Sequence, residues 1–446
     1  MNRVPETKFS TITNKYPSHR DEYVKGCWKW LKGRRADDSA EGLWRVNDKL
    51  YDLTSYVNRH PGGREWLILA KGTDITEAFE VFHLSSKPAE VLQKFYVRDA
   101  KEPRNYRLTF NEDGFFKTLR RRCIDRLKTI DIKAHEWRSK VIFDFFLFGL
   151  LAFSCMSVVY VDKNIRFMSA VAAGVFACFL VNAGHNFIHK KNSWRMYGCH
   201  AVMVNFKEFR VFHAMSHHLY PNSIYDLETS IYEPFFKYLP IEKSPIRIFF
   251  NYFWIPFVYV FGFHGALAYR CLSTLQIDRK VDRQIFYLDD LIGLCLPVLM
   301  YVVGNFLSSV TALEVFIAWN IIFCAASVTF SVIGLNAGHH GTEIAHEGDE
   351  FKSLDFGIYQ MAATIDRYEA NSNLFMILTH YGEHILHHML PTLDHSVLYN
   401  FRDILEETCL EFKEDLKLIS IATATIEQFK QLKRTEVKML KDTKVE

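Results

Sequence analysis

Many histidines of this chain stand in short clusters whose spacing suits metal binding. The chain has 19 histidines in 446 residues, and eight of them lie in the segments GHNFIHKK, HAMSHH and HILHH. These candidate metal ligands and catalytic residues are His185, His189, His213, His217, His218, His384, His387 and His388. Imidazole binds iron, zinc, copper and nickel, so the spacing alone leaves the metal open. Eight imidazoles exceed the four ligands of one tetrahedral zinc ion, so the clusters predict two metal ions.

A fourth histidine segment, NAGHHGTE, follows the last long apolar run. Its Asn336 and His340 are four residues apart, so on a helix they share one face. We expect both at the same metal centre, where Asn336 orients a water or another ligand. The neighbouring His339 is assigned no role, and solitary histidines are expected to be structural or exposed. The solitary histidines in question are His200, His264, His346, His380 and His395.

The second cluster, HAMSHH, does not suit a regular helix that presents three imidazoles to one centre. At about 100° per residue, His217 lies about 40° from His213, whereas His218 lies about 140° away. We therefore predict either a bend in this segment or different metal ions for His213 and His218.

A separate pair of histidines stands in the first hundred residues. His60 belongs to the motif HPGG, whose small residues let the backbone pass close to a flat cofactor. His83 ends an apolar helical stretch further along the chain. Two imidazoles on opposite sides of one haem iron leave no open coordination position. The pair therefore predicts a haem that transfers electrons and binds no substrate.

Long apolar runs must position the three histidine clusters. Those of about 20 residues are long enough to cross a bilayer as helices. The runs cover residues 141–160, 167–184, 248–268, 288–308 and 314–335. Short loops join the first two runs and the last two, which predicts two membrane hairpins. A crossing at 248–268 would separate the clusters, so we expect that run to lie in the interface or to re-enter, and we predict four crossings.

Composition excludes several other classes of protein. The formal net charge of +3 gives no argument for binding nucleic acid. The nine cysteines contain no CxxC pair, so neither a disulfide framework nor a zinc ribbon is indicated. The N-terminus has no apolar signal segment, so we expect the N-terminal part to stay cytosolic. Residues 101–140 carry 12 Lys and Arg against six Asp and Glu, which is typical of a segment that faces anionic lipid.

The order of these features predicts five parts of the chain. They are a polar N-terminal segment (1–35), a small haem-binding domain (36–100), a basic juxtamembrane connector (101–140), a membrane domain (141–400) and a charged C-terminal tail (401–446).

Two stretches resemble known families. Residues 41–98, with HPGG, YDL and the run DITEAFEVFH, resemble a cytochrome b5 domain. Residues 141–400 resemble the membrane fatty acid desaturase and hydroxylase superfamily. The resemblance lies in the order of the three histidine clusters, which are called histidine boxes in that family, and in the HHMLP of the third box. With its haem domain first, the chain is identified as a member of the cytochrome b5-fused membrane fatty acid desaturases. This resemblance implies an α+β haem domain followed by an all-α membrane domain with four transmembrane helices and cytosolic histidine-rich helices.

The resemblance also implies cofactors, partners and a location. His60 and His83 would be the axial ligands of haem b, and the histidine clusters would hold a di-iron centre. NADH-cytochrome b5 reductase would supply electrons, and O2 would desaturate a fatty acyl chain carried by CoA or by a phospholipid. The expected location is the endoplasmic reticulum membrane, with several crossings and both termini cytosolic.

Three departures from the family pattern leave alternatives open. Asn186 stands where fused desaturases have Asp, the second box reads HxxxHH where most have HxxHH, and His384 stands where front-end enzymes have Gln. The HxxxHH box is similar to that of membrane alkane hydroxylases, so an acyl or alkyl hydroxylase on the same centre is one alternative. A non-catalytic membrane haem protein that passes electrons to a partner is another.

Overall fold

The computed structural model describes residues 10–21, 25–191, 193–275 and 288–439. Its N-terminal domain combines a small antiparallel sheet with short helices, which confirms the predicted α+β class. The strands, in the order β1-β2-β3, are β1 (Trp44–Val46), β2 (Lys49–Tyr51) and β3 (Tyr96–Asp99). Asn47, in the two-residue turn between β1 and β2, has a φ of 53°, a left-handed conformation that asparagine tolerates. Between β2 and β3 the chain forms η1 (Val57–Arg59), α2 (Arg64–Leu69), α3 (Thr76–Phe82) and α4 (Lys87–Gln93).

The described part of the polar N-terminal segment is folded against the rest of the chain. Its helix α1 (Cys27–Asp37) buries Trp30 in the core of the N-terminal domain. Ile12 is fully buried, and Thr13 forms an isolated β-bridge with Tyr106. Apolar side chains scattered among polar ones therefore anchor this segment.

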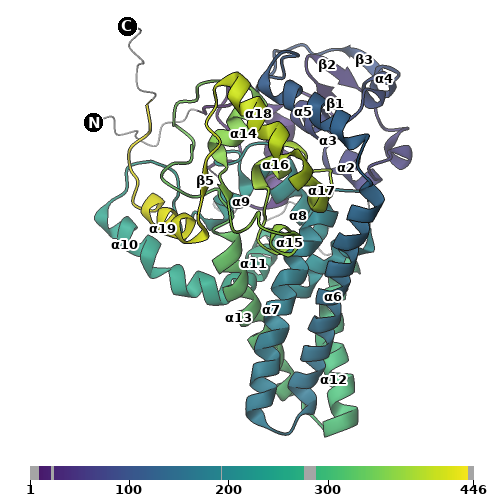
Figure 1. Cartoon of the computed structure of the whole chain (residues 1–446), viewed down its shortest axis with the longest axis vertical. Coiled ribbons are helices and arrows are strands. Elements are labelled where there is room, and N and C mark those ends of the chain that lie inside the picture. Colours follow the sequence, from purple (N-terminus) through teal and green to yellow (C-terminus); the bar gives the residue numbers. More distant parts are fainter. Residues whose placement is uncertain (1–9, 22–24, 192, 276–287, 440–446) are drawn as a thin grey trace.

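Four long apolar helices form a bundle that reaches the lower end of the molecule (Figure 1). They are α6 (Ile132–Val159), α7 (Lys163–Ile188), α12 (Cys295–Ser308, preceded by the short η4, Leu288–Leu294) and α13 (Ala312–Gly334). Asp162 caps α7, and Thr311 forms a capping box with Glu314 at the start of α13. These short capped connections confirm the two predicted hairpins.

Helices α7 and α13 pack closely because a glycine lies between them. A Cβ atom on Gly174 would lie 2.5 Å from the Cβ of Ala325 and 2.6 Å from the carbonyl oxygen of Ile322. The small residue therefore sets the separation of α7, which carries His185 near its end, and α13, which leads into the segment with His339.

The apolar run 248–268 is divided between two helices, α10 (Pro245–Phe253) and α11 (Ile255–Leu275). A further kink occurs at Phe261, whose φ of −114° and ψ of 17° are not helical. In Figure 1, α10 runs obliquely to the direction of the bundle. Part of α11 is long and apolar enough to cross a membrane, as are the four bundle helices. The chain is therefore a multi-pass membrane protein, and the predicted number of four crossings stays a prediction.

Shorter elements cover one end of the bundle beside the N-terminal domain (Figure 1). Before α10 these are η2 (Trp194–Val202), α8 (Phe206–Phe209), the π-helix η3 (Arg210–His217) and α9 (Leu227–Tyr232). After α13 they are α14 (Phe356–Ala363), α15 (Leu374–Thr379), α16 (His384–Met389), α17 (His395–Leu398), η5 (Tyr399–Phe401), α18 (Arg402–Phe412) and α19 (Ile421–Gln431), with the parallel strands β4 (Asp366–Arg367) and β5 (Leu418–Ile419).

The segment predicted as a basic connector (101–140) contains a helix that packs on the segment predicted as a C-terminal tail (401–446). Helix α5 (Phe115–Leu127) buries Phe116 in one core with residues of α16 and α18. Its Arg122 donates to the Thr408 hydroxyl at 2.9 Å, and Arg126 pairs with Asp403 at 2.9 Å. Much of the positive charge of 101–140 is therefore paired within the protein. The boundaries of the five predicted parts stay predictions.

Candidate metal centre and haem site

Nine buried imidazoles gather in two adjacent groups. In each group, one ligand atom per residue lies within 4.8 Å of the others. The first group contains His185, His189, His213, His218 and His387, and the second contains His217, His339, His384 and His388. All eight histidines of the three boxes are included, and His339 is the ninth.

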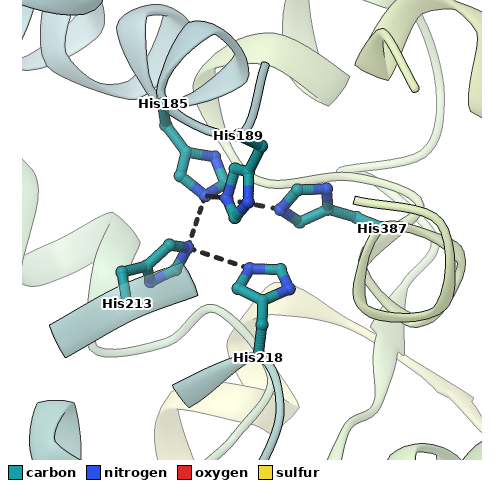
Figure 2. A group of neighbouring side chains, drawn as sticks. All are labelled: His185, His189, His213, His218 and His387. Atoms are coloured by element: carbon teal, nitrogen blue, oxygen red, sulfur yellow. Dashed lines mark hydrogen bonds between the residues drawn. The ribbon is translucent and has the colours of Figure 1, made fainter. Parts of the chain in front are cut away.

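The five rings of the first group come from α7, from η3 and from α16 and point toward one another (Figure 2). The Nε2 atom of His185 lies 2.5 Å from that of His213, 3.1 Å from that of His189 and 3.3 Å from that of His387. Two nitrogens bound at about 2.1 Å to one ion, at right angles, lie about 3 Å apart. The Nε2 of a neutral imidazole carries either one N–H or one lone pair, so that of His185 cannot satisfy three close neighbours by hydrogen bonding, and the arrangement fits a shared cation.

The second group lies directly beside the first. The Nε2 atoms of His339 and His384 are 2.7 Å apart, and the ring centroids of His217 and His339 are 4.2 Å apart. The ring of His388 stacks on that of His218 at 4.1 Å between centroids, which joins the two groups. A donor set of nine imidazoles without thiolates suits two iron ions.

Hydrogen bonds hold five of these rings in the orientation that metal binding needs. The Nδ1 acceptors are Glu228 for His213, Asp226 for His217, Gln360 for His388, and the carbonyl oxygens of Ala363 and Tyr381 for His339 and His384, at 2.6 to 3.2 Å. An Nδ1–H donor leaves the lone pair of Nε2 free, so each bond prepares a ring to bind an ion.

Burial favours the neutral, metal-binding form of most of the clustered histidines that lie outside the membrane helices. It lowers the pKa well below the usual value for His218, His339, His384, His387 and His388. Burial also lowers the pKa of His217, but the carboxylates of Asp226 and Glu228 outweigh it and raise that pKa to about 9. The surroundings of His217 therefore favour a positive charge, which a bound metal ion supplies as well as a proton does.

The second box contains the predicted bend, in the form of a π-helix. The backbone N–H of His218 donates to the carbonyl of His213 at 2.9 Å, one residue further than in an α-helix. The wider turn places the Nε2 atoms of His213 and His218 3.0 Å apart, in the same group. His217 belongs to the other group, although His213 also lies close to His217 and Glu228 in a third set of possible ligand atoms. The bend is confirmed, and separate ions for His213 and His218 stay an alternative prediction.

The helix face predicted for Asn336 and His340 is wrong. Helix α13 ends at Gly334, so these two residues do not follow each other along a helix. His339 belongs to the second group instead, and His340 stacks on Tyr238 with 3.7 Å between ring centroids. His340 belongs to neither imidazole group among the described residues.

Two carboxylates that support the second box were missed from the sequence. Asp226 and Glu228 lie at the start of α9, and Asp226 also caps this helix by accepting from the Thr229 N–H. An acidic pair a few residues after a histidine box was the available signal, but its contacts depend on how the intervening loop folds.

His60 and His83 face each other in the N-terminal domain as the sequence predicts. Their ring centroids are 6.1 Å apart, and their Nδ1 atoms donate to the carbonyls of Gly63 and Phe79, both at 2.9 Å. An iron bound at about 2 Å to an Nε2 on each side needs about this separation. A Cβ atom on Gly62 would lie 2.9 Å from the His60 ring, so this glycine of HPGG is needed there. The pair fits the axial ligation of haem.

An apolar cavity of about 190 Å³ borders both imidazole groups. Its lining includes His185 and His213 of the first group, His339 and His384 of the second, and the side chains of Val181, Phe263 and Phe330 from α7, α11 and α13. The cavity therefore connects the candidate metal centre with an apolar space between membrane helices.

A haem domain, a membrane bundle and two imidazole groups beside an apolar cavity define a class of lipid-modifying membrane oxidoreductases. The family "Fatty acid desaturase" matches residues 165–415, and "Cytochrome b5-like Heme/Steroid binding domain" matches residues 28–101. The chain therefore belongs to the fatty acid desaturase family, with a cytochrome b5-like domain at its N-terminal end, and is a desaturase-like oxidoreductase.

Individual relatives agree with this assignment. The cytochrome b5-related protein of Drosophila melanogaster is 39% identical over 439 residues, which cover 97% of each chain. The Delta(5) fatty acid desaturase A of Dictyostelium discoideum is 28% identical over 40% of each chain. The acyl-lipid (8-3)-desaturase of Mortierella alpina is 26% identical over 50% of this chain and 53% of its own. No solved structure matches the chain.

Proposed function

We propose that this chain desaturates a fatty acyl chain with O2 at two non-haem irons and receives the electrons through its own haem. The observation that carries the proposal is the position of nine buried imidazoles, in two adjacent groups, on the border of an apolar cavity. Membership of the fatty acid desaturase family supports the same reaction class.

Each part of the site has a role in this proposal. The irons, when bound, would activate O2, and a haem between His60 and His83 would supply single electrons. The Nε2 atoms of the two imidazole groups would hold the irons, and Glu228 and Asp226 keep His213 and His217 oriented. The apolar side chains of the cavity hold the acyl chain and exclude water.

The location of the imidazoles supports four membrane crossings. His218 precedes α10 and α11, whereas His339 and His388 follow α13, yet all three lie in one site. Because α12 and α13 form a hairpin that returns to the same side, α10 and α11 together must begin and end on that side. Exposed aromatic side chains on α10 suit a helix lying in the membrane interface. They belong to Phe249, Phe250 and Phe253.

The electron donor and location complete the proposal. A haem with two histidine ligands has no open position for a substrate and needs an external electron donor. We assign that part to NADH-cytochrome b5 reductase, at the cytosolic face of the endoplasmic reticulum membrane, where both termini would lie. The acyl chain would be carried by CoA or by a phospholipid.

One observation favours hydroxylation as a second candidate. The second box has the HxxxHH spacing, which is similar to that of membrane alkane hydroxylases, and is wound as a π-helix. Desaturation and hydroxylation both begin with the removal of a hydrogen from the acyl chain, so hydroxylation is compatible with the same centre.

Lipid analysis of a desaturase-deficient yeast that expresses the full chain tests the function. We expect an acyl product lighter by two hydrogens, whereas hydroxylation would give a product heavier by one oxygen. His388→Ala should eliminate the product, and His380→Ala should retain it because His380 belongs to neither group of the described residues. Unchanged lipids with the wild-type chain, or product formation by His388→Ala, would contradict the proposal.

A further inference from the structure

The second histidine box is packed directly against the haem-binding domain. Val211 and Met215 of η3 belong to the same hydrophobic cluster as Leu67 and Leu69 of α2. His213 and His217, on the same π-helix, belong to the imidazole groups. One short element therefore contacts the haem domain on one side and the candidate iron ligands on the other.

Arg210, the first residue of η3, touches both sides of this contact. Its side chain is fully buried, and its guanidinium carbon lies 4.7 Å from the ring centroid of Trp66 in α2. Its Nε donates to the carbonyl of Ile188 at 2.9 Å, and its Nη2 donates to the carbonyl of Lys190 at 3.1 Å. These two carbonyls flank His189, so one guanidinium joins an indole of the haem domain to the first and second histidine boxes.

Trp66 in turn lies beside the chain segments that carry the haem ligands. It follows the HPGG motif of His60 by only a few residues, and its ring is 5.6 Å from that of Phe82. Phe82 directly precedes His83. The indole therefore stands between the segments that carry the two haem ligands and the Arg210 guanidinium.

We propose that Trp66 and Arg210 form the electron path from the haem to the two imidazole groups, an inference that rests on the proposed function. Trp66 provides the aromatic contact at the haem side, and Arg210 positions it against the backbone that carries His189 and His213. For each electron transferred, one haem iron is oxidised from ferrous to ferric and one non-haem iron is reduced from ferric to ferrous. No proton or leaving group is involved.

The test is the rate of haem reoxidation in the full chain without oxygen, after flash reduction of the haem. Protein with ferric iron in the two imidazole groups is compared with protein that carries zinc there, because zinc accepts no electron. In the iron form, Trp66→Leu and Arg210→Gln should slow reoxidation at least severalfold, because each variant removes one partner of the contact between the indole and the guanidinium. Trp66→Phe, which keeps an aromatic ring, should lie between Trp66→Leu and the wild type.

Two matched controls separate the path from general effects. Trp137→Leu removes an exposed indole of α6, and Lys117→Gln removes an ammonium group that pairs with Glu80 at another contact of the haem domain. Both should keep the wild-type rate. All variants should keep the wild-type haem reduction potential and iron content.

A measurement on haem-loaded protein without other metals gives an independent readout. Arg210→Gln should increase hydrogen exchange in residues 64–69, because the contact that holds α2 on η3 is lost, whereas Lys117→Gln should not. Wild-type rates in Trp66→Leu and Arg210→Gln, or unchanged exchange at 64–69, would overturn the proposed path. Equal haem reoxidation in the iron and zinc forms of the wild type would instead overturn the proposed function.

Discussion

Glu228 offers a sharp test of how the protein prepares its metal ligands. Its carboxylate accepts a hydrogen bond from Nδ1 of His213 at 2.6 Å, and Glu228→Gln replaces this charged acceptor by a neutral amide of equal size. Losing such a partner of a ligating histidine costs roughly tenfold to a hundredfold in metal affinity, or about 1.4 to 2.8 kcal/mol. Asp226 is a poorer target because it also caps α9 through Thr229.

The assay is competition between the purified full chain and a chelator for iron, with haem content measured in the same samples. We expect Glu228→Gln to weaken one of two non-haem iron sites by the stated factor and to leave haem binding unchanged. His340→Ala serves as the control, because His340 belongs to neither imidazole group of the described residues. Wild-type affinity in Glu228→Gln, or an equal loss in His340→Ala, would refute the assignment of Glu228 to His213.

Three further outcomes follow from the structure. His60→Ala should abolish the haem absorbance and leave the non-haem sites able to bind iron, as measured by absorbance and metal analysis; persistent haem absorbance would contradict axial ligation. Gly174→Ala should lower the free energy of unfolding by about 1 to 3 kcal/mol, because the added methyl group overpacks α7 against Ala325. In the control Gly265→Ala the new methyl group meets no atom within 4 Å, so the unfolding midpoint should stay almost unchanged. Equal midpoints in the two variants would contradict the packing. Burial, with a smaller contribution from neighbouring cations, lowers the pKa of His19 from 6.5 to about 3. Between these two values the imidazole of His19 therefore binds a proton in the unfolded chain and stays neutral in the folded chain. The stability of the wild type relative to His19→Gln should therefore fall as pH is lowered from about 6.5 toward 3, and a constant difference would contradict it.

The sequence predicts the chemistry of the metal centre better than it predicts which histidines belong to that centre. Spacing identified eight of the nine clustered imidazoles, because His pairs and triplets beside apolar runs are visible without a fold. The choice between His339 and His340 depends on the backbone beyond α13, where the helix ends at Gly334 and Gly338 takes a φ of 104°. Such a change of direction reverses which of two adjacent side chains faces the site.

Long-range packing accounts for the remaining differences. The angular conflict within HAMSHH predicted a bend, but its π-helical form is known only from the hydrogen bond between His218 and His213. The basic segment 101–140 has the composition of a lipid-facing connector, yet Arg122 and Arg126 find partners near the other end of the chain. Periodicity and charge along a sequence carry no information about contacts between residues so far apart.

The iron content and Mössbauer spectrum of the purified, iron-57-enriched full chain report directly how many irons the two imidazole groups hold. We expect two non-haem irons for each haem, with the non-haem signal lost or reduced to one iron in His388→Ala while the haem signal remains. A wild-type spectrum in which all iron is haem, or a His388→Ala spectrum identical to the wild type, would contradict it.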